Sequence, residues 1–539
     1  MKSHLHTDKT ISLKNTDTFD IDMTPIQIEN ASITDVSTIP DKTPGKLRDH
    51  QIEHFHRLEK VVQHSFGYLD SSPTGSGKTY VTCEMAKRYG MSLLVVGPVS
   101  ILPEWRKVAS EFGVNVIGTL SYSMFRGVSG KVNHNFLHRQ GKNYAITPYF
   151  QEWLKYRVLL VFDEVQNLKN KGTCQREAAL TLVRAIISHN NGSRIALLSA
   201  TPYDKDDLCE SIILLLGLTK RNKLYSYSPR TRVALDAGIT DVIKVCEKLD
   251  PKATLELDSM RGNYKTYPAI LYSRVLKYHY SSTMPSPPIP VEQDIKNGFY
   301  RMTHDTIAEI TQAQHKLRIG LNMSRNGEYE HNRDSFAIIQ NYIQAVEKAK
   351  LSTLVRLAEE TLVNNPQSKV ILYVWYTNSV KWLMEQLSSF NPTALNGPVK
   401  PKDRPAIIAA FQEPSSKSRL LISHPQVGGV GISLDDRDGN WPRYVYAIPN
   451  YHYILLHQIA GRVYRTDTKS AAPVRYVYSR DNNDETTILN AIIRKAKTVT
   501  DSLFMGNESG YFNGHDAYYE PEPEFVYIPM KRRIVVASV

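Results

Sequence analysis

The chain has 539 residues, and its 66 Lys and Arg against 54 Asp and Glu give a formal net charge of +12. This length predicts about three domains with large cores. The charge is uneven: residues 1–45 hold 4 basic and 7 acidic residues and residues 505–539 hold 3 and 5, which leaves about +17 between them. A basic region of this size favours a polyanionic partner, nucleic acid before an anionic membrane, with an ordinary solvated surface as the alternative.

The cysteines and the apolar runs exclude several other classes of protein. The four cysteines form no CxxC pair, so neither a zinc site nor a disulfide framework is indicated and a reducing compartment is predicted. The N-terminal stretch "MKSHLHTDKTISLKN" lacks the apolar core of a signal peptide, and the longest apolar run, "IILLLGL", is too short to span a bilayer. We expect a soluble intracellular protein of the cytoplasm, nucleus or nucleoid, or a virus-encoded one.

Residues 46–218 follow a polar, acidic leader at 1–45 and alternate short apolar runs with helical patterns. Buried apolar strands that alternate with helices predict a parallel sheet with helices on both faces. The strand candidates of this first region are "SLLVVGP", "VNVIGTL", "NYAIT", "RVLLVFDE" and "SRIALLSA".

The stretch "SSPTGSGKTY" at 71–80 lies between the end of a strand, "GYLD", and a helical pattern, "KTYVTCEMAKRYG". Strand, glycine-rich loop and helix is the context of a phosphate-binding loop. Backbone N–H groups of residues 74–78 can surround phosphate oxygens, Lys78 can contact the β- and γ-phosphates, and the Thr79 hydroxyl can bind Mg²⁺. Ser72 occupies the position of the first Gly of the general pattern. The alternative is a Gly/Ser turn with a chance lysine.

Two adjacent carboxylates follow a buried strand in "LLVFDEVQNLKN". Ligands of open α/β sheets bind at the carboxyl ends of the strands, where Asp163 and Glu164 would lie. Asp163 can hold Mg²⁺ while Glu164 accepts a proton from the attacking water. The carboxylate pair alone is weak evidence for a catalytic site. It becomes strong evidence because it lies downstream of the phosphate-binding loop and is followed by "LLSATP".

Residues 219–349 have a different composition, with tyrosines interleaved among Lys and Arg and a stiff "PSPPIP" segment. Aromatic faces can stack on bases while the cations hold phosphates, so this region is a candidate nucleic-acid contact surface. The alternative, which we slightly favour, is that the tyrosines pack an inserted subdomain. The tyrosines concerned are Tyr225, Tyr227, Tyr264, Tyr267, Tyr272, Tyr278 and Tyr280.

A second set of strand candidates begins near residue 350 with "KVILYVWY", "SRLLISH", "YVYAI" and "VRYVYS". It predicts a second α/β lobe. The "EPEPEF" stretch of the tail is expected to be an exposed acidic segment.

These motifs, in this order, resemble those of a superfamily 2 helicase/translocase over residues 46–218 and 350–480. The elements that carry the resemblance are "LRDHQ", "VVGPVSILPEW", "SYS", "SATP", "VGGVGISL" and "HQIAGRVYR". Their spelling is closest to chromatin-remodelling-type translocases, and to strawberry-notch-type helicases and related helicases of large DNA viruses. Gln166 stands where those branches usually have His, and Ser433 where many helicases have Asp, which leaves the coupling details open.

Together with the two motifs above, the resemblance implies a role for each site residue. Catalysis would use Lys78, Asp163, Glu164, Gln458, Arg462 and Arg465, the last two as arginine fingers. ATP would contact Gln51, Thr74, Gly75, Ser76, Gly77, Lys78, Thr79 and Gly431, and Mg²⁺ would be held by Thr79 and Asp163. Hydrolysis would be coupled to movement by Gln166, Ser199 and Thr201, and nucleic acid would contact Pro98, Trp105, Ser121, Tyr122, Thr377 and Gly429.

The fold implied is α/β, with two RecA-like parallel-sheet lobes of the P-loop NTPase type and an inserted mixed or helical subdomain. The predicted domains are a leader (1–45), lobe 1 (46–218), the insertion (219–349), lobe 2 (350–504) and an acidic tail (505–539). The function indicated is an ATP-dependent motor on DNA, more readily a duplex translocase than an unwinding helicase. An RNA helicase or transcript-release factor is the alternative, and a structural subunit without turnover is the third hypothesis.

Overall fold

The computed structural model describes residues 46–128, 131–141, 143–227, 234–285, 290–325, 333–429, 431–465, 467–481, 485–502 and 514–522. The predicted leader at 1–45 lies outside the described residues. We call residues 46–285 lobe 1 and residues 290–522 lobe 2. No described helix combines the length and the apolar character that crossing a bilayer requires.

Lobe 1 is built on a six-stranded sheet in the order β10-β1-β7-β6-β2-β3, and all of its pairings are parallel. The central strands are apolar and buried on both faces, which is the pattern of a sheet covered by helices. The strands are β1 (Gly67–Asp70), β2 (Ser92–Gly97), β3 (Val116–Ser121), β6 (Val158–Asp163), β7 (Arg194–Leu198) and β10 (Ser281–Ser282).

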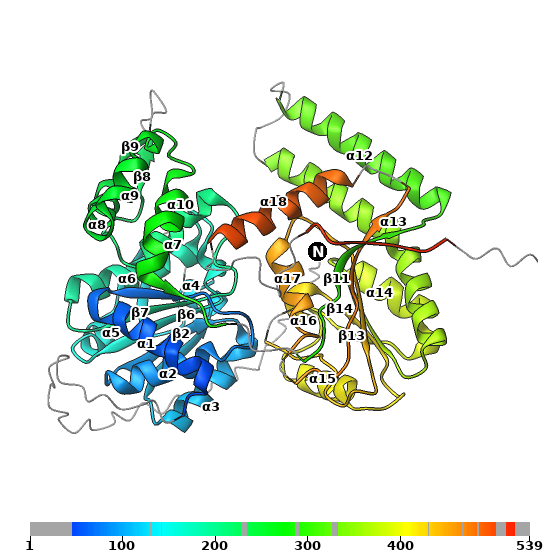
Figure 1. The fold of residues 1–539 in the computed structure, drawn as a ribbon, viewed down its shortest axis with the longest axis horizontal. Coiled ribbons are helices and arrows are strands. Elements are labelled where there is room, and N and C mark those ends of the chain that lie inside the picture. The colour runs from blue at the N-terminus through cyan, green and yellow to red at the C-terminus, as the bar shows by residue number, and fades with distance from the viewer. Residues whose placement is uncertain are drawn as a thin grey trace, which may run out of the picture. The chain divides into compact units, whose positions relative to one another are not determined.

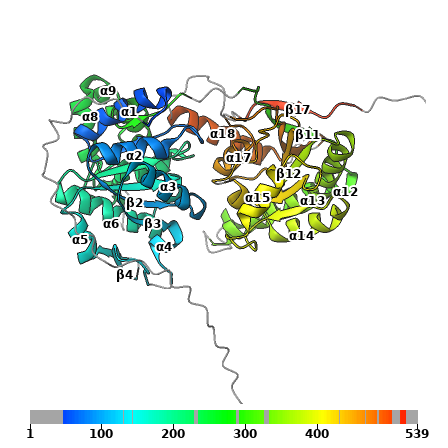
Figure 2. The same ribbon diagram turned by 90° about the horizontal axis from the view of Figure 1, so that it is seen from below.

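Helices cover both faces of this sheet, as Figures 1 and 2 show for lobe 1. One face carries α1 (Asp49–His64), α2 (Lys78–Arg88) and α3 (Leu102–Phe112), which pack against one another. The other face carries α4 (Tyr122–Arg126), α6 (Cys174–His189) and α7 (Cys209–Leu215). This arrangement confirms the predicted parallel α/β lobe.

One strand candidate of lobe 1 joins a different structure. The "NYAIT" stretch forms β5 (Asn143–Ile146), which pairs antiparallel with β4 (Leu137–Gln140) in a two-stranded hairpin outside the parallel sheet. Its residues are alternately exposed and half-buried, as expected for a hairpin with one solvent-exposed face, whereas a parallel strand such as β6 is buried throughout. Helix α5 (Pro148–Trp153) then leads into β6.

Residues 219–280 extend lobe 1. They form β8 (Tyr225–Tyr227), β9 (Ala234–Asp236), α8 (Ile239–Leu249), α9 (Pro251–Glu256), α10 (Tyr267–Leu271), the π-helical turn η6 (Tyr272–Leu276) and α11 (Lys277–Tyr280). Buried side chains of α8 and η6 share one hydrophobic core with the lobe 1 helices. Tyr267 and Tyr272 are fully buried in that core, and the Tyr272 hydroxyl bonds the Ser281 hydroxyl at 2.7 Å. For these two tyrosines the packing alternative is therefore correct.

Truncating Tyr267 is expected to destabilise lobe 1. The Tyr267→Ala variant removes a buried ring and should lower the free energy of unfolding by about 3 to 5 kcal/mol, measured by urea denaturation. Tyr267→Phe keeps the ring and should unfold close to wild type. Weaker nucleic-acid binding by Tyr267→Ala at unchanged stability would contradict the packing role.

Lobe 2 contains a seven-stranded sheet in the order β13-β14-β12-β15-β16-β11-β17, and its pairings are also all parallel. The four strand candidates near and after residue 350 form β12, β14, β15 and β16. The bounds are β11 (Ile295–Tyr300), β12 (Lys369–Tyr373), β13 (Thr393–Leu395), β14 (Leu420–Ser423), β15 (Arg443–Ala447), β16 (Val474–Ser479) and β17 (Ala517–Tyr519).

Successive residues of β12 point to opposite faces, as the period of a strand requires. Ile371 and Tyr373 belong to one hydrophobic cluster, whereas Val370 and Leu372 belong to another. Figure 1 shows the helices of this lobe around the sheet. They are α12 (His304–Arg325), α13 (Arg333–Asn364), α14 (Thr377–Gln386), α15 (Arg404–Gln412), α16 (Pro425–Gly428), α17 (Tyr453–Ala460) and α18 (Thr486–Ser502).

The predicted insertion at 219–349 is not a separate subdomain in the structure. Its segment up to β10 belongs to lobe 1, where β10 pairs with β1, and from β11 onward it belongs to lobe 2, where β11 pairs with β16. Part of the predicted tail is also built into lobe 2, because β17 pairs with β11. Glu520 is buried and accepts hydrogen bonds from Arg356 and Arg301 at 2.7 Å, so it is not part of an exposed segment.

Candidate nucleotide-binding and catalytic site

The glycine-rich loop joins β1 to the N-terminus of α2, as its sequence predicts. Gly75 (φ 82°) and Gly77 (φ 91°) adopt left-handed backbone conformations that other residues rarely accept, and Gly77 is the N-cap of α2. Lys78 is the first residue of the helix, and its ammonium donates to the Ser72 and Pro73 carbonyls at 2.8 and 3.0 Å. The loop thus presents backbone N–H groups and one cation at a helix N-terminus, which is the arrangement that binds phosphate.

Ser72 has a structural role that its sequence position did not reveal. Its backbone N–H and hydroxyl both donate to Asp70, and its hydroxyl accepts from the Met284 N–H at 2.8 Å. A glycine could not make the hydroxyl contacts. Ser72 therefore ties the phosphate-binding loop to the chain that follows β10.

Asp70 lies at the base of the loop and is completely buried. Burial works to raise the pKa of Asp70, but the His54 imidazole 3.1 Å away, Lys78 and Ser72 together hold that pKa below its usual value. Sequence reasoning missed this contact, because His54 and Asp70 have no motif spacing and meet only when α1 packs on the sheet.

Gln51, one of the predicted ATP contacts, lies against the phosphate-binding loop. It is buried on α1, its Oε1 accepts from the Arg48 N–H at 3.0 Å, and its Nε2 donates to the Ser76 carbonyl at 3.0 Å. A side chain on Gly77 would collide with the Gln51 amide. Gln51 and the loop therefore form one assembly beside the phosphate site.

Asp163 ends β6 inside a network of hydrogen bonds. Trp105 Nε1 donates to its carboxylate at 2.8 Å, and the Tyr122 hydroxyl donates to its backbone carbonyl at 2.8 Å. Burial and the neighbouring Glu164 carboxylate raise the pKa of Asp163 to about 6. Such a carboxylate gains from a nearby cation, and its oxygen, with the Thr79 hydroxyl, is of the ligand type that Mg²⁺ prefers.

The same contacts correct two of the predicted nucleic-acid residues. Trp105 and Tyr122 are 1% and 6% exposed, so neither ring presents a face to a strand. Their polar atoms instead orient Asp163. Two side chains that were expected to contact nucleic acid thus position Asp163 instead.

Glu164 lies in a chain of side chains that joins the two lobes. It has a left-handed backbone (φ 55°), and its Oε2 accepts from Gln166 Nε2 at 2.5 Å and from Gln458 Nε2 at 3.0 Å. Gln166 in turn accepts from the Ser199 hydroxyl at 2.6 Å, and that hydroxyl accepts from the Thr201 N–H at 2.9 Å. The predicted coupling residues are therefore connected to Glu164 by hydrogen bonds.

The two predicted arginine fingers follow α17, where Arg462 is buried and Arg465 is half-buried. The side-chain hydrogen bonds of Arg462 and Arg465 go to backbone carbonyls, with the Ile432 carbonyl shared at 3.1 and 3.3 Å, and Arg465 Nε has no hydrogen-bond partner within the described residues. Burial, followed by the charge of Arg462, lowers the pKa of Arg465 to about 9. A side chain on Gly75 would collide with the Arg465 guanidinium, which therefore lies at the phosphate-binding loop.

The remaining predicted residues are spread around this site. A Cβ on Gly461, beside Arg462, would lie 3.0 Å from the Thr74 hydroxyl. Gly431 has a left-handed backbone, and a Cβ there would lie 2.7 Å from the Ser100 hydroxyl. Four predicted nucleic-acid residues remain: Pro98 is half-buried, Thr377 is exposed at the start of α14, Ser121 is buried as the N-cap of α4, and Gly429 is buried where a side chain would collide with the Pro425 carbonyl.

One further group was missed by sequence reasoning. Asp204, three residues beyond Thr201, is buried between Lys169 of lobe 1 at 2.5 Å and Lys495 of α18 in lobe 2 at 3.4 Å. Burial works to raise the pKa of Asp204, but the two lysines hold it below its usual value. No local pattern marks Lys495, since it lies almost three hundred residues from its partner.

The fold and the site define a two-lobed P-loop NTPase that hydrolyses ATP. Residues 44–204 match the family described as "Type III restriction enzyme, res subunit", and residues 349–467 match the family described as "Helicase conserved C-terminal domain". Together the two matches cover about half of the chain. The chain belongs to the superfamily 2 helicases and is an ATP-dependent nucleic-acid helicase or translocase.

Individual relatives are distant. A curated protein of Acanthamoeba polyphaga mimivirus, named provisionally as an ATP-dependent RNA helicase, is 24% identical over 483 residues, covering 86% of this chain and 85% of its own. S. cerevisiae Dbp5 bound to RNA and ADP BeF3 shows 13% identity and a TM-score of 0.42, covering 88% of this chain and 94% of that one. The Sulfolobus solfataricus SWI2/SNF2 ATPase core in complex with dsDNA shows 15% identity and a TM-score of 0.27, with 86% and 98% covered.

Proposed function

We propose that this chain is a Mg²⁺-dependent motor that uses ATP hydrolysis to move along duplex DNA. The observation that carries the motor assignment is Glu164, which is hydrogen-bonded to Gln166 of lobe 1 and to Gln458 of lobe 2. Because Glu164 is hydrogen-bonded to both lobes, its position as catalytic base depends on the separation of the lobes.

The residues divide the chemistry between the lobes. Lys78 and the backbone N–H groups of its loop bind the β- and γ-phosphates, and Glu164 accepts the proton of the attacking water. Asp163 and Thr79 would hold Mg²⁺, which neutralises charge on the phosphate oxygens when bound. Arg462 and Arg465 bring positive charge from lobe 2 to the γ-phosphate as negative charge spreads over it.

Movement follows from the split site. ATP binds both the lobe 1 loop and the lobe 2 arginines, so it favours the closed arrangement, and loss of the γ-phosphate removes that bridge. The Gln166–Ser199–Thr201 chain connects Glu164 to the segment that leads to Asp204, which pairs with Lys495 of lobe 2. A cycle of closing and opening on a bound strand would produce a step.

The choice of duplex DNA over RNA rests on one family match and on motif spellings in both lobes. Residues 44–204 match the family described as "Type III restriction enzyme, res subunit", and restriction enzymes are defined by their action on DNA. The motif spellings of "GPVSILPEW" and "GRVYRTDTKS" support the same choice. The distant relative named as an RNA helicase supports the alternative, an RNA helicase or transcript-release factor.

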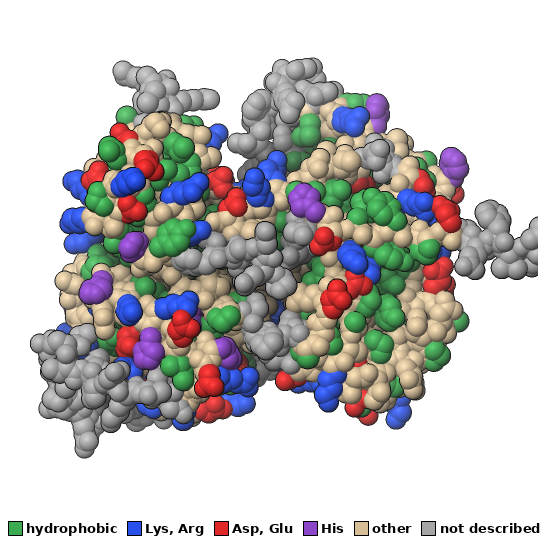
Figure 3. Space-filling view, viewed as in Figure 1, with side chains coloured by type: hydrophobic (Ala, Val, Ile, Leu, Met, Phe, Trp, Pro, Cys, Tyr) green, Lys and Arg blue, Asp and Glu red, His purple; other side chains and the backbone are tan. Residues whose placement is uncertain are grey.

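Binding to nucleic acid is expected to weaken steeply with salt. The net charge of +17 on residues 46–504 predicts binding to the phosphate backbone of the nucleic acid with little sequence preference. Each phosphate contact then contributes about −0.9 to the slope of log affinity against log salt. Figure 3 shows Lys and Arg mixed with Asp and Glu over α8 and α9, so we expect several separate contacts in place of one continuous basic surface.

Fluorescence anisotropy of a labelled duplex between 50 and 300 mM salt, run without nucleotide, measures this slope. Several duplexes of unrelated sequence provide the control for specificity. Affinity that is independent of salt, or no binding at the lowest salt, would mean that the basic charge is only solvated surface.

A further inference from the structure

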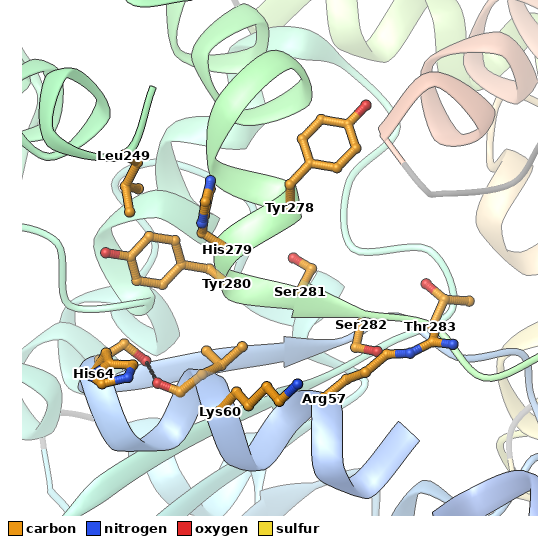
Figure 4. A pocket seen from close by; sticks show the side chains of 12 residues that line it. Arg57, Lys60, His64, Leu249, Tyr278, His279, Tyr280, Ser281, Ser282 and Thr283 are labelled. Carbon is orange, nitrogen blue, oxygen red and sulfur yellow. Dashed lines mark hydrogen bonds between the residues drawn. The ribbon is translucent and has the colours of Figure 1, made fainter. Parts of the chain in front are cut away.

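A cavity of about 590 Å³ lies in lobe 1 on the side of β10, between α1 and the end of α11. This is within the range of cavities that bind small ligands in proteins. Figure 4 shows its side chains: α1 supplies Arg57, Lys60 and His64, and the chain around β10 supplies tyrosine, histidine and hydroxyl groups. None of the functional roles assigned above uses this cavity.

The lining is basic and aromatic. Arg57, Lys60, His64 and His279 contribute nitrogen donors, Tyr280 contributes a ring, and none of the described residues that line the cavity carries a carboxylate. Arg57 does pair with Glu53 one turn earlier on α1, but both side chains of that pair are more than half exposed. An exposed pair within one helix binds weakly, so the guanidinium can exchange Glu53 for a ligand anion.

The two ends of the cavity carry different kinds of side chain. In Figure 4 the Arg57 guanidinium extends toward Ser282 and Thr283, and the Lys60 ammonium lies on the side of the guanidinium nearer to His64. Tyr280 and Leu249 lie toward the other end, where α1 carries His64. One end therefore offers cations and hydroxyls, and the other offers a flat ring beside an apolar side chain.

The two hydroxyl groups at the cationic end are held in place by contacts to α1 and to the base of the phosphate-binding loop. The Ser282 hydroxyl bonds His54 Nδ1 at 3.0 Å, and the Thr283 hydroxyl bonds the Ser71 hydroxyl at 2.5 Å. These contacts fix Ser282 and Thr283 before any ligand binds, so less conformational entropy is lost on binding.

We propose that this cavity is an accessory site for a nucleoside phosphate, with the phosphate held by Arg57 and Lys60 and the base stacked on Tyr280. Aromatic rings stack on any base and the cations hold the phosphate without reading its sequence. The ligand is either one nucleotide of a bound strand or a free mononucleotide. Only the strand form rests on the proposed function, since the free form needs no motor activity.

The test is photocrosslinking at saturating ADP, which fills the phosphate-binding loop. One arm uses 5-iodo-dUMP, and the other uses a single-stranded DNA oligonucleotide that carries one 5-iodo-deoxyuridine. Crosslinked peptides are mapped by mass spectrometry. Wild type should crosslink at Tyr280, and the Arg57→Glu/Lys60→Glu variant should lose about tenfold of that crosslink. Its hydrolysis of ATP without nucleic acid should equal that of wild type, which shows that it folds.

The Lys87→Glu/Lys155→Glu variant is the matched control, because both lysines are exposed, neither lines the cavity, and Lys155 has a helical partner as Arg57 has. It should crosslink like wild type. Crosslinking in the oligonucleotide arm alone supports the strand source, and crosslinking in both arms supports recognition of the nucleoside phosphate itself. Absence of any crosslink at residues 278–280, or equal crosslinking in the two variants, would overturn the proposal. If the oligonucleotide binds nowhere on the protein, the proposed function fails while the mononucleotide arm still tests the cavity.

Discussion

Replacing Arg465 with alanine should slow ATP hydrolysis by a factor of about 10³, the range that an arginine finger supplies, while ATP affinity changes little. Arg465 is half-buried next to the buried Arg462, and its side chain bonds only a backbone carbonyl among the described residues. The described residues give neither arginine a hydrogen-bonded carboxylate partner, and cations withdrawn from water are costly unless an anion meets them. Their position at Gly75 indicates that this anion is the terminal phosphate of ATP.

Single-turnover hydrolysis and equilibrium binding of a fluorescent ATP analogue separate the two quantities. Arg465→Lys is the informative control, because an ammonium lacks the planar fork of a guanidinium and should restore little of the rate. Nucleic acid should bind the Arg465→Ala variant but should not stimulate it. Normal hydrolysis with lost nucleic-acid binding would instead make Arg465 a strand contact and leave Arg462 as the finger, and normal turnover in both single variants would refute the split site.

Lys78→Ala and Glu164→Gln should each reduce ATP turnover by about 10² or more, for different reasons. Lys78 supplies the cation of the phosphate-binding loop, so its loss should also weaken ATP binding. Glu164→Gln removes the base but keeps an amide of the same shape, so ATP should still bind and hold the lobes closed on nucleic acid. Steady-state hydrolysis and ATP binding measured side by side provide the comparison.

A matched control for this pair is Gln51→Ala. Gln51 contacts the Ser76 carbonyl beside the loop but carries no charge, so its loss should affect ATP binding more than the rate at saturation. Turnover at the wild-type rate in either Lys78→Ala or Glu164→Gln would refute the roles given to those residues.

The fold could be predicted where an apolar run marks a buried parallel strand. Strands β2, β6, β7, β12 and β16 all lie within predicted runs, because a strand covered on both faces must be apolar throughout. Strands β10, β11 and β17 were missed, since β10 has only two residues and β11 contains Lys296 and Asn297 among its six. The strands with which β10, β11 and β17 pair lie far away in the sequence. No local pattern therefore predicts that residues 219–349 are divided between the lobes.

In the site, too, local sequence motifs could be predicted, whereas contacts between residues far apart in the sequence could not. The phosphate-binding loop and the Asp163–Glu164 pair are local motifs, and the structure places them at the carboxyl ends of β1 and β6, which both pair with β7 in one sheet. The roles of Trp105 and Ser72 depend instead on distant partners, namely Asp163 and the Met284 backbone. Sequence reasoning could name the residues of "GPVSILPEW" but not the direction in which the indole points.

The most direct test of the central claim is the rate of ATP hydrolysis by the full chain without nucleic acid and then with single-stranded DNA, duplex DNA and RNA at matched phosphate concentration. Glu164→Gln serves as the control for contaminating hydrolases. We predict that duplex DNA stimulates hydrolysis most and that Glu164→Gln stays near background throughout. Stimulation by RNA alone would contradict the choice of DNA, and an equal rate under all four conditions would contradict a nucleic-acid motor altogether.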